Sequence, residues 1–205
     1  MPERREHWDH VYRTKTETEV SWYQSHSAQS LALIRSEASD FSCSIIDVGG
    51  GASHLVDDLL SQGYADLTVL DISEAALNRS RERLAPLADK VAWIAADITQ
   101  WKPQRTWDVW HDRAVFHFLT ERHDQDAYIA ALTAATRAGS IAVISTFALN
   151  GPERCSGLPV QRYDAAGLAA RINDGFQLIS ETTEAHRTPG GAIQNFVYAV
   201  LKRVA

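Results

Sequence analysis

The chain has 205 residues, of which 45% are hydrophobic, and this is enough for one domain with a core of its own. Its formal net charge is −6 and no block of Lys and Arg stands out, which argues against nucleic acid and anionic membranes as main partners. The first residues, MPERREHWDH, carry no apolar signal core and no segment approaches a membrane span, so we expect a cytoplasmic protein without membrane association.

Two short helices, over residues 3–13 and 27–38, are predicted before a regular alternation of strands and helices begins. Five apolar runs are predicted to be strands: Ser44–Val48, Leu67–Leu70, Val91–Ala95, Trp107–His111 and Ile141–Thr146. The intervening helices are Ser53–Gln62, which ends at Gly63, a helix N-capped by Ser73 and running to about Leu84, and Asp124–Arg137. Strands without polar alternation, separated by helices, indicate a parallel sheet that is buried on both faces.

The C-terminal part has a different pattern. After a segment with Gly and Pro but no clear period, residues 151–160, which we interpret as a loop, a helix is predicted near Asp164–Ile172. Residues Phe176–Ala185 and Ile193–Leu201 flank the sequence TPGG and are predicted to form a hairpin. The sheet is therefore expected to begin with parallel strands and to finish with an antiparallel strand.

Three acidic residues stand at or near the ends of successive predicted strands: Asp47, Asp71 and Asp97. Asp47 precedes three glycines, Gly49 to Gly51, whose backbone could approach a ligand closely; a tight turn without any ligand is the simpler alternative. The carboxyl ends of parallel strands meet at one edge of the sheet, where ligands bind. An acid after the second strand typically accepts hydrogen bonds from ribose hydroxyls, so the three acids together suggest a nucleoside site.

The glycine turn does not match the dinucleotide fingerprint G-x-G-x-x-G, because His54 stands where the third glycine belongs. A carboxylate such as Asp47 would also repel a pyrophosphate, whereas it would favour a cofactor with a cationic end. S-adenosylmethionine, which has a sulfonium, an ammonium and no phosphate, is therefore preferred to NAD.

These features resemble the class I S-adenosylmethionine-dependent methyltransferases over roughly residues 44–205. The matching motifs are the Asp47–Gly51 turn, the acids Asp71 and Asp97, the fourth-strand segment WDVWHDRAVFHFL and the turn RAGS before the fifth strand. The resemblance implies an α/β fold, a Rossmann-like, seven-stranded, mostly parallel sheet with helices on both faces and an antiparallel C-terminal hairpin strand. It implies one domain over residues 1–205, with an N-terminal helical lid (1–40) and an acceptor-side loop (147–163).

The resemblance also implies roles for single residues. Gly49 and Gly51 would line the methionine portion of S-adenosylmethionine and Asp47 would face its amine. Asp71 would hold the ribose and Ile72 pack on the adenine, while Asp97 would bind the adenine amino group with a backbone contact from Ile98. His111 would lie near the methionine carboxylate or the sulfonium.

The N-terminal stretches HWDHVY and SWYQSH, together with HDRAVFHF, are similar to thiopurine methyltransferases and related small-molecule enzymes; the N-terminal pair also resembles some protein-lysine methyltransferases. Trp8, Tyr12 and Trp22 are therefore expected to cover the cofactor, although they could equally be a packing staple. Arg113 is the candidate clamp on a carboxylate or an anionic substrate, with a surface salt bridge as the alternative. His111 and His117 are candidate bases, with a packed core histidine the more frequent role for His117.

We therefore expect an enzyme that transfers a methyl group from S-adenosylmethionine to a nucleophilic heteroatom of a small molecule, for example a thiol, with S-adenosylhomocysteine as product. A protein-lysine methyltransferase is the first alternative, and a non-catalytic adenosyl-binding regulator or an NAD-dependent oxidoreductase is an alternative of another class. Cys43 and Cys155 suggest no disulfide framework, and no Cys/His spacing is typical of zinc, so no metal is expected. The chain is expected to be a monomer or a homodimer.

Overall fold

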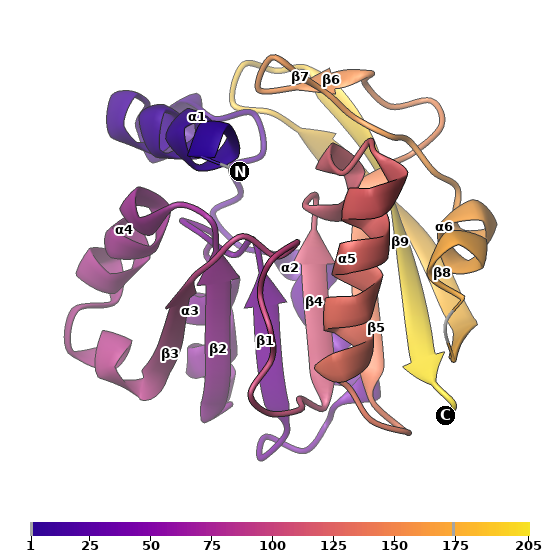
Figure 1. The fold of residues 1–205 in the computed structure, drawn as a ribbon. Coiled ribbons are helices and arrows are strands. Elements are labelled where there is room, and N and C mark those ends of the chain that lie inside the picture. Colours follow the sequence, from indigo (N-terminus) through magenta and orange to yellow (C-terminus); the bar gives the residue numbers. More distant parts are fainter. Residues whose placement is uncertain (1, 174) are drawn as a thin grey trace.

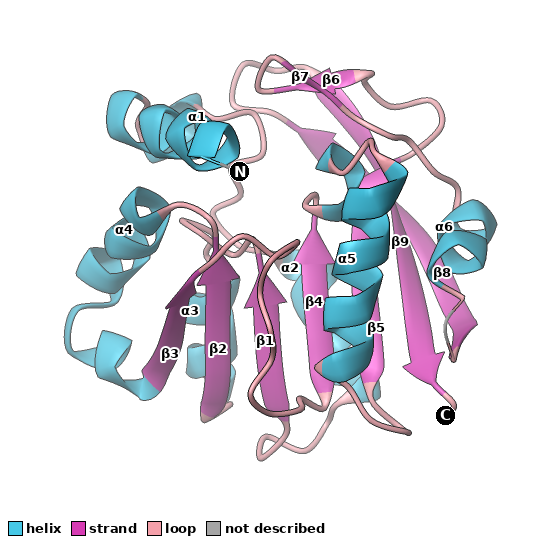
Figure 2. Cartoon of the chain, in the orientation of Figure 1, coloured by secondary structure: helices cyan, strands magenta, loops and turns pink. Residues whose placement is uncertain are grey.

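The computed structural model describes residues 2–173 and 175–205, and its centre is a seven-stranded sheet with the order β3-β2-β1-β4-β5-β9-β8 (Figures 1 and 2). The strands are β1 (Ser44–Val48), β2 (Asp66–Asp71), β3 (Val91–Ala95), β4 (Val109–Arg113), β5 (Ile141–Phe147), β8 (Phe176–Arg187) and β9 (Ile193–Arg203). The α-helices are α1 (Pro2–Thr14), α2 (Ala28–Glu37), α3 (Leu55–Gln62), α4 (Glu74–Leu84), α5 (Arg122–Ala134) and α6 (Ala165–Ile172). Strands β1 to β5 pair in parallel, and β9 pairs antiparallel with both β5 and β8, so the Rossmann-like sheet predicted from the sequence is confirmed.

Helices cover both faces of the sheet because the side chains of each strand alternate between two apolar cores. Ile46 and Val48 pack with Tyr128 of α5 and Leu168 of α6. Ile45 packs on the opposite face, against α2, α3 and α4. A sheet that is buried on both sides needs apolar residues at nearly every strand position, which explains why the strand sequences show no polar alternation.

Local signals in the sequence fix several element boundaries. The Ser73 Oγ accepts a hydrogen bond from the Ala76 N–H (3.2 Å), and the Asp164 carboxylate accepts one from the Gly167 N–H (2.7 Å), so both residues are N-caps. Gly63 ends α3 with φ of 100°. Strands β1 and β3 have the predicted bounds, and the hairpin of β8 and β9 around TPGG is confirmed.

Two sequence-based expectations about the elements were wrong. The fourth strand, β4, runs over Val109–Arg113 and not Trp107–His111, because the Trp107 N–H donates to the carbonyl of Ala135 outside the sheet. Residues 151–160 are not only loop: β6 (Arg154–Cys155) and β7 (Leu158–Pro159) pair across Ser156 and Gly157, whose φ angles of 49° and 78° fit a tight two-residue turn.

Helix α1 lies across the carboxyl ends of the parallel strands, above α4 in Figure 1. Asp9 of α1 accepts a hydrogen bond from the Ser73 hydroxyl at the start of α4 (2.6 Å), and Arg4 forms an ion pair with Asp124 of α5. A 3₁₀ turn, η1 (Glu17–Glu19), follows α1. These contacts hold the N-terminal segment as a cover over the edge of the sheet where the strands end.

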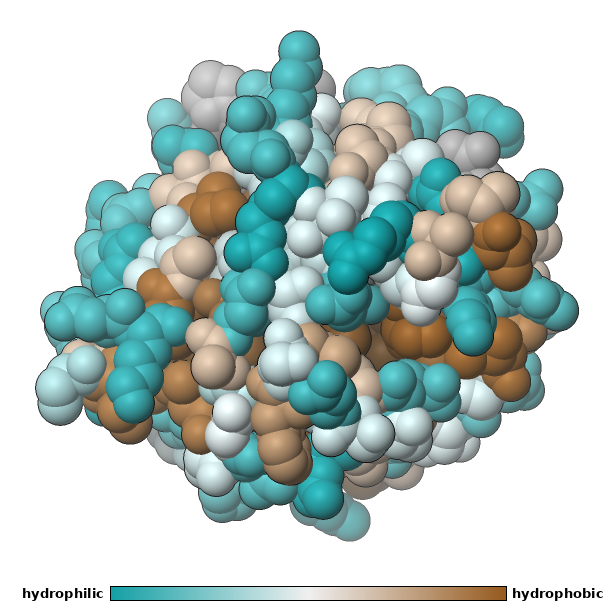
Figure 3. Space-filling view, turned by 90° about the horizontal axis from the view of Figure 1, so that it is seen from below, coloured by the Kyte–Doolittle hydropathy of each residue, from teal (hydrophilic) through white to brown (hydrophobic). Residues whose placement is uncertain are grey.

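The opposite end of the molecule, seen from below in Figure 3, mixes many hydrophilic residues with smaller apolar patches. None of the helices in the described part of the chain is long and apolar enough to span a membrane.

A buried carboxylate, Asp112, fixes the chain immediately after β4. It accepts hydrogen bonds from the N–H groups of Val115 (2.7 Å) and Phe116 (3.0 Å) and from the Tyr128 hydroxyl (2.6 Å), and Tyr128 in turn accepts one from the indole of Trp110 (2.9 Å). Burial raises the pKa of Asp112 to about 6, but the hydrogen bonds favour its charged form. Asp112 therefore determines the course of the segment that contains Arg113 and Val115.

We predict that Asp112→Asn lowers the free energy of unfolding by about 3 kcal/mol, because an amide in this place presents an N–H to buried N–H donors. The measurement is urea denaturation at pH 7.5. Tyr128→Phe is the matched control and should cost only about 1–2 kcal/mol, since the two backbone donors keep their acceptor. A smaller loss in Asp112→Asn than in Tyr128→Phe would contradict this account.

Candidate active site

The turn after β1 comes unusually close to its neighbours because it consists of glycines. Gly49 has φ of 70°, and an added Cβ there would collide with the Val115 side chain. An added Cβ at Gly50 would collide with the Asp47 carboxylate, and one at Gly51 would lie 2.6 Å from the Asp71 Oδ2. The bare backbone thus allows two carboxylates to lie against the turn.

Two cavities open at this edge of the sheet, beneath α1. The large cavity has a volume of about 900 Å³ including its mouth, and the small cavity about 640 Å³. They are adjacent, and the residues that line both are Tyr12, Trp22, Gly49 and Arg113. Both lie where ligands bind in open α/β sheets, beyond the carboxyl ends of the strands.

One side of the large cavity is formed by residues that follow β2 and β3: Asp71, Ile72, Asp97 and Ile98. Burial, together with the charges of Asp47 and Asp9, raises the pKa of Asp71 to about 7, although the Ser73 N–H donates to this carboxylate (2.8 Å). Burial would raise the pKa of Asp97 too, but hydrogen bonds from the hydroxyl and N–H of Thr99 help to hold it below its usual value. Both acids therefore face the cavity as acceptors of hydrogen bonds.

Asp47 and His111 are register partners in the neighbouring strands β1 and β4, so their side chains lie together in the small cavity. The His111 Nδ1 lies 2.7 Å from the Asp47 Oδ1, and its Nε2 lies 2.9 Å from the Ser30 hydroxyl. Because both nitrogens of this buried imidazole have partners within the protein, the geometry does not support the catalytic-base role that the sequence suggested for it. His111 instead orients the Asp47 carboxylate.

His117 lies behind the wall of the large cavity and is completely buried. Its Nδ1 accepts a hydrogen bond from the Phe147 N–H (3.3 Å), and its Nε2 has no hydrogen-bond partner among residues 2–173 and 175–205. Burial lowers the pKa of His117 to about 3, so the ring is neutral at physiological pH. The rings of Phe118 and Phe147 pack on it at 4.5 and 4.8 Å, so the structure favours a packed core histidine over the predicted base.

Arg113 ends β4 at the junction of the two cavities. Its Nε donates to the Tyr198 hydroxyl (3.1 Å), its Nη2 lies 3.5 Å from the Glu184 carboxylate, and its guanidinium stacks over the Phe196 ring at 4.3 Å. The charge is thus balanced by Glu184, while the guanidinium remains in both cavity walls. The ion pair that was the alternative is present, and the clamp on a carboxylate stays a prediction.

The other side of the large cavity is a set of aromatic rings from distant parts of the chain. Trp8 of α1 packs edge-on against Phe118 (5.0 Å) and Trp22 (5.7 Å), and Phe147 of β5 packs against its register partner Phe196 of β9 (4.8 Å). Cys155 of β6 also lines the cavity, and burial raises the pKa of its thiol to about 11.

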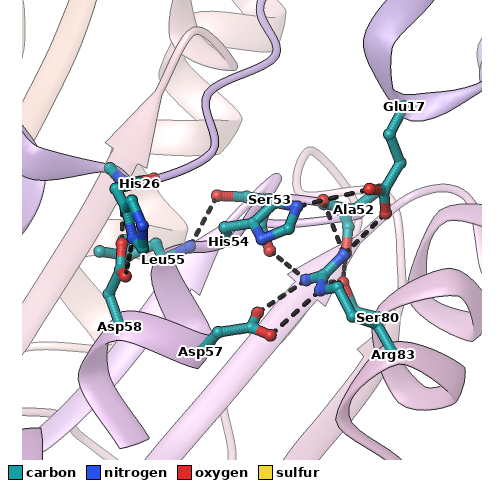
Figure 4. Close-up of polar contacts among 12 residues, drawn as sticks. Glu17, His26, Ala52, Ser53, His54, Leu55, Asp57, Asp58, Ser80 and Arg83 are labelled. Carbon is teal, nitrogen blue, oxygen red and sulfur yellow. Dashed lines mark hydrogen bonds and ion pairs between the residues drawn. The ribbon is translucent and has the colours of Figure 1, made fainter. Parts of the chain in front are cut away.

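Sequence reasoning placed nearly all of its cofactor candidates at this site: only Gly51 lies outside both cavities, and Gly50 lines the small cavity in its place. It missed Phe118, Phe147 and Phe196, which carry no local signal because each is apolar within an apolar segment. It also gave no role to Arg83 of α4, whose guanidinium contacts the turn after β1 and the N-terminal segment (Figure 4).

Comparisons with known proteins agree with this architecture. Residues 45–139 match the model of a methyltransferase domain family. A search of curated proteins finds no match to the chain. A structure described for the conversion of a disulfide bond into a thioacetal group in echinomycin biosynthesis has 20% identity and a TM-score of 0.74, covering 98% of this chain and 93% of that one.

Two further solved structures are similar. The 1,6-didemethyltoxoflavin-N1-methyltransferase of Burkholderia thailandensis, with 1,6-didemethyltoxoflavin and S-adenosylhomocysteine bound, has 15% identity and a TM-score of 0.72, covering 100% of this chain and 85% of that one. The glycopeptide N-methyltransferase MtfA with S-adenosylmethionine has 15% identity and a TM-score of 0.68, covering 92% and 99%. Residues 45–139 thus match a methyltransferase domain, and the whole chain shares the fold of these two methyltransferases.

Proposed function

We propose that this chain is an S-adenosylmethionine-dependent methyltransferase that acts on a nucleophilic heteroatom of a small and largely apolar molecule. The observation that carries the proposal is the aromatic side of the large cavity, formed by Trp8, Trp22, Phe118, Phe147 and Phe196. Such a wall favours an apolar or aromatic ligand. The similar structures described above include an enzyme with a small molecule bound, 1,6-didemethyltoxoflavin, and this supports the same substrate class here.

The remaining surfaces fit the parts of S-adenosylmethionine. We propose that Asp71 accepts hydrogen bonds from the ribose and that Ile72, Asp97 and Ile98 hold the adenine. The amino acid end would lie in the small cavity, with its ammonium near Asp47 and its carboxylate near Arg113. The sulfonium would then lie near Gly49, beside the rings of Tyr12 and Trp22, which attract a cation.

S-adenosylmethionine supplies an electrophilic methyl group and a good leaving group when it is bound. The protein's contribution is to align the acceptor with that group and to exclude water beneath α1. The described lining of the large cavity includes no free base: Asp71 and Asp97 are on the cofactor side, and Cys155 keeps its proton. We therefore infer an acceptor with a lone pair already available, such as a neutral nitrogen or a readily ionised thiol.

The alternative of a protein-lysine methyltransferase would need acidic groups to attract an ammonium. On the acceptor side the charged residues in the described lining are Arg4 and Arg113, and Glu184 nearby is occupied by Arg113, Tyr198 and Gln24. The described lining on this side thus offers no acid to attract a cation, which favours the small-molecule proposal.

A screen of acceptors tests the proposal directly. We expect S-adenosylhomocysteine release with aromatic thiols and heteroaromatic amines, and none above background with a lysine peptide or aliphatic carboxylates. Turnover of the lysine peptide with no activity on the aromatic compounds would overturn the substrate class. Tight binding of S-adenosylmethionine without turnover of any compound would favour a non-catalytic regulator, and binding of NAD instead would favour an oxidoreductase.

The cofactor assignment predicts that Asp71→Ala raises the Kd of S-adenosylhomocysteine about 100-fold, because two hydrogen bonds to a charged acceptor are lost. Isothermal titration calorimetry measures this. Asp66→Ala, at the other end of β2 and exposed, is the matched control and should leave the Kd unchanged. An unchanged Kd in Asp71→Ala would refute the ribose assignment.

The same carboxylate predicts a pH dependence of binding. The ribose hydroxyls, as donors, favour the ionised form of Asp71. At a pH below its pKa of about 7 Asp71 is protonated, so binding should release that proton. The Kd of S-adenosylhomocysteine should therefore fall about tenfold between pH 6 and pH 8. Calorimetry across this range should show the same dependence disappear in Asp71→Asn, and a flat profile in the unmodified protein would argue against this role.

A further inference from the structure

Arg83, near the end of α4, donates to the carbonyls of the turn that follows the glycines (Figure 4). Its Nη2 donates to the Ser53 carbonyl (2.7 Å) and its Nη1 to the Ala52 carbonyl (3.2 Å). The Ser80 hydroxyl of the same helix donates to the Gly51 carbonyl (2.7 Å). Two side chains of α4 therefore hold three successive carbonyls of the turn, here called the glycine turn (residues 49–54).

This arrangement determines which groups of the glycine turn face the small cavity. The C=O and N–H of a trans peptide point in opposite directions. Carbonyls held towards α4 therefore direct the N–H groups of Ala52 and His54 away from it. Ala52, Ser53 and His54 all line the small cavity, so the shape of its wall depends on the Arg83 contacts.

Arg83 also contacts the N-terminal cover. Its Nη1 lies 2.9 Å from the Glu17 carboxylate in η1, directly after α1, and the other Glu17 oxygen lies 3.4 Å from the His54 Nε2. Asp57 of α3 holds the guanidinium from a third direction, at 2.8 and 3.1 Å. Figure 4 shows the guanidinium between Glu17, Asp57 and the glycine turn, so one side chain joins the cover to the wall beneath it.

The two sides of the small cavity belong to these two segments. Tyr12, Glu17 and Tyr23 come from the N-terminal region, while Ala52 and His54 come from the glycine turn, and the Tyr23 and His54 rings meet edge-on at 5.8 Å. Glu17 lines this cavity, so its contacts with Arg83 and His54 contribute to the enclosure of a ligand there. Arg83 itself is partly buried, with 19% of its side chain exposed, so its contacts are less screened than those of a fully exposed pair.

We propose that Arg83 is a positioning residue that couples closure of residues 2–19 over the cofactor to the shape of the glycine turn. Cofactor binding favours the closed cover, and the Glu17–Arg83 contact in turn favours cofactor binding, since coupling between two events is reciprocal. Arg83 does not touch the reacting atoms. Its effect reaches the cofactor through the turn and through Glu17.

The test compares Arg83→Met, Arg83→Lys and Glu17→Gln with Arg81→Met. Arg81 is the matched control because it lies on the same helix and pairs with Glu74, away from the turn and the cover. The Kd of S-adenosylhomocysteine should rise at least tenfold in Arg83→Met and about threefold in Glu17→Gln, with Arg83→Lys between them and Arg81→Met unchanged. The double variant of Glu17→Gln and Arg83→Met should bind no more than twofold worse than Arg83→Met alone.

Hydrogen–deuterium exchange, measured with S-adenosylhomocysteine at saturation, distinguishes the proposed coupling from a merely structural role of Arg83. Peptides from residues 2–19 should exchange faster in Arg83→Met and Glu17→Gln than in Arg81→Met, while peptides from α5 exchange alike in all. Unchanged affinity and unchanged exchange in Glu17→Gln and Arg83→Lys would overturn the proposal, as would independent effects in the double variant. If Arg83→Met does not fold, the Glu17→Gln and Arg83→Lys comparisons decide.

Discussion

The site depends on the close packing of two carboxylates, Asp47 and Asp71, against the glycines of the turn after β1. A Cβ at Gly50 or Gly51 would occupy the space that these carboxylates fill. Burial and repulsion from Asp47 raise the pKa of Asp71 to about 7, so the site favours groups that donate hydrogen bonds or carry positive charge. A cofactor with a ribose, an ammonium and a sulfonium supplies such groups, whereas a pyrophosphate would not.

The cover formed by α1 is held at several points by polar contacts at its ends and by aromatic packing in its middle. Asp9 binds the start of α4, Arg4 pairs with Asp124, and Glu17 reaches Arg83. Between them, Trp8 packs on Trp22 and Phe118. This combination would suit the proposed role of the segment, which is to exclude water from the reaction and to open for exchange of cofactor and product.

The acceptor side differs from the cofactor side in its chemistry. It is aromatic, its arginines are paired with acids, and the nearby histidines are either fully hydrogen-bonded or buried and neutral. Under the proposed function, catalysis would rest on alignment and exclusion of water rather than on proton transfer by a side chain. The acceptor's own ionisation would then determine which molecules react.

The sequence by itself determined the order of strands and helices, the caps at Ser73, Gly63 and Asp164, and the acids at the strand ends, because these signals lie within a few residues of the structure that they specify. Tertiary structure alone decided three contacts: His111 is within hydrogen-bond distance of Asp47 and Ser30, Phe147 packs against Phe196, and Arg83 joins Glu17 to the glycine turn. These partners are about 30 to 80 residues apart in sequence. These contacts depend on which strands become neighbours in the sheet and on the face of the sheet to which each side chain points. No local pattern of residues specifies either.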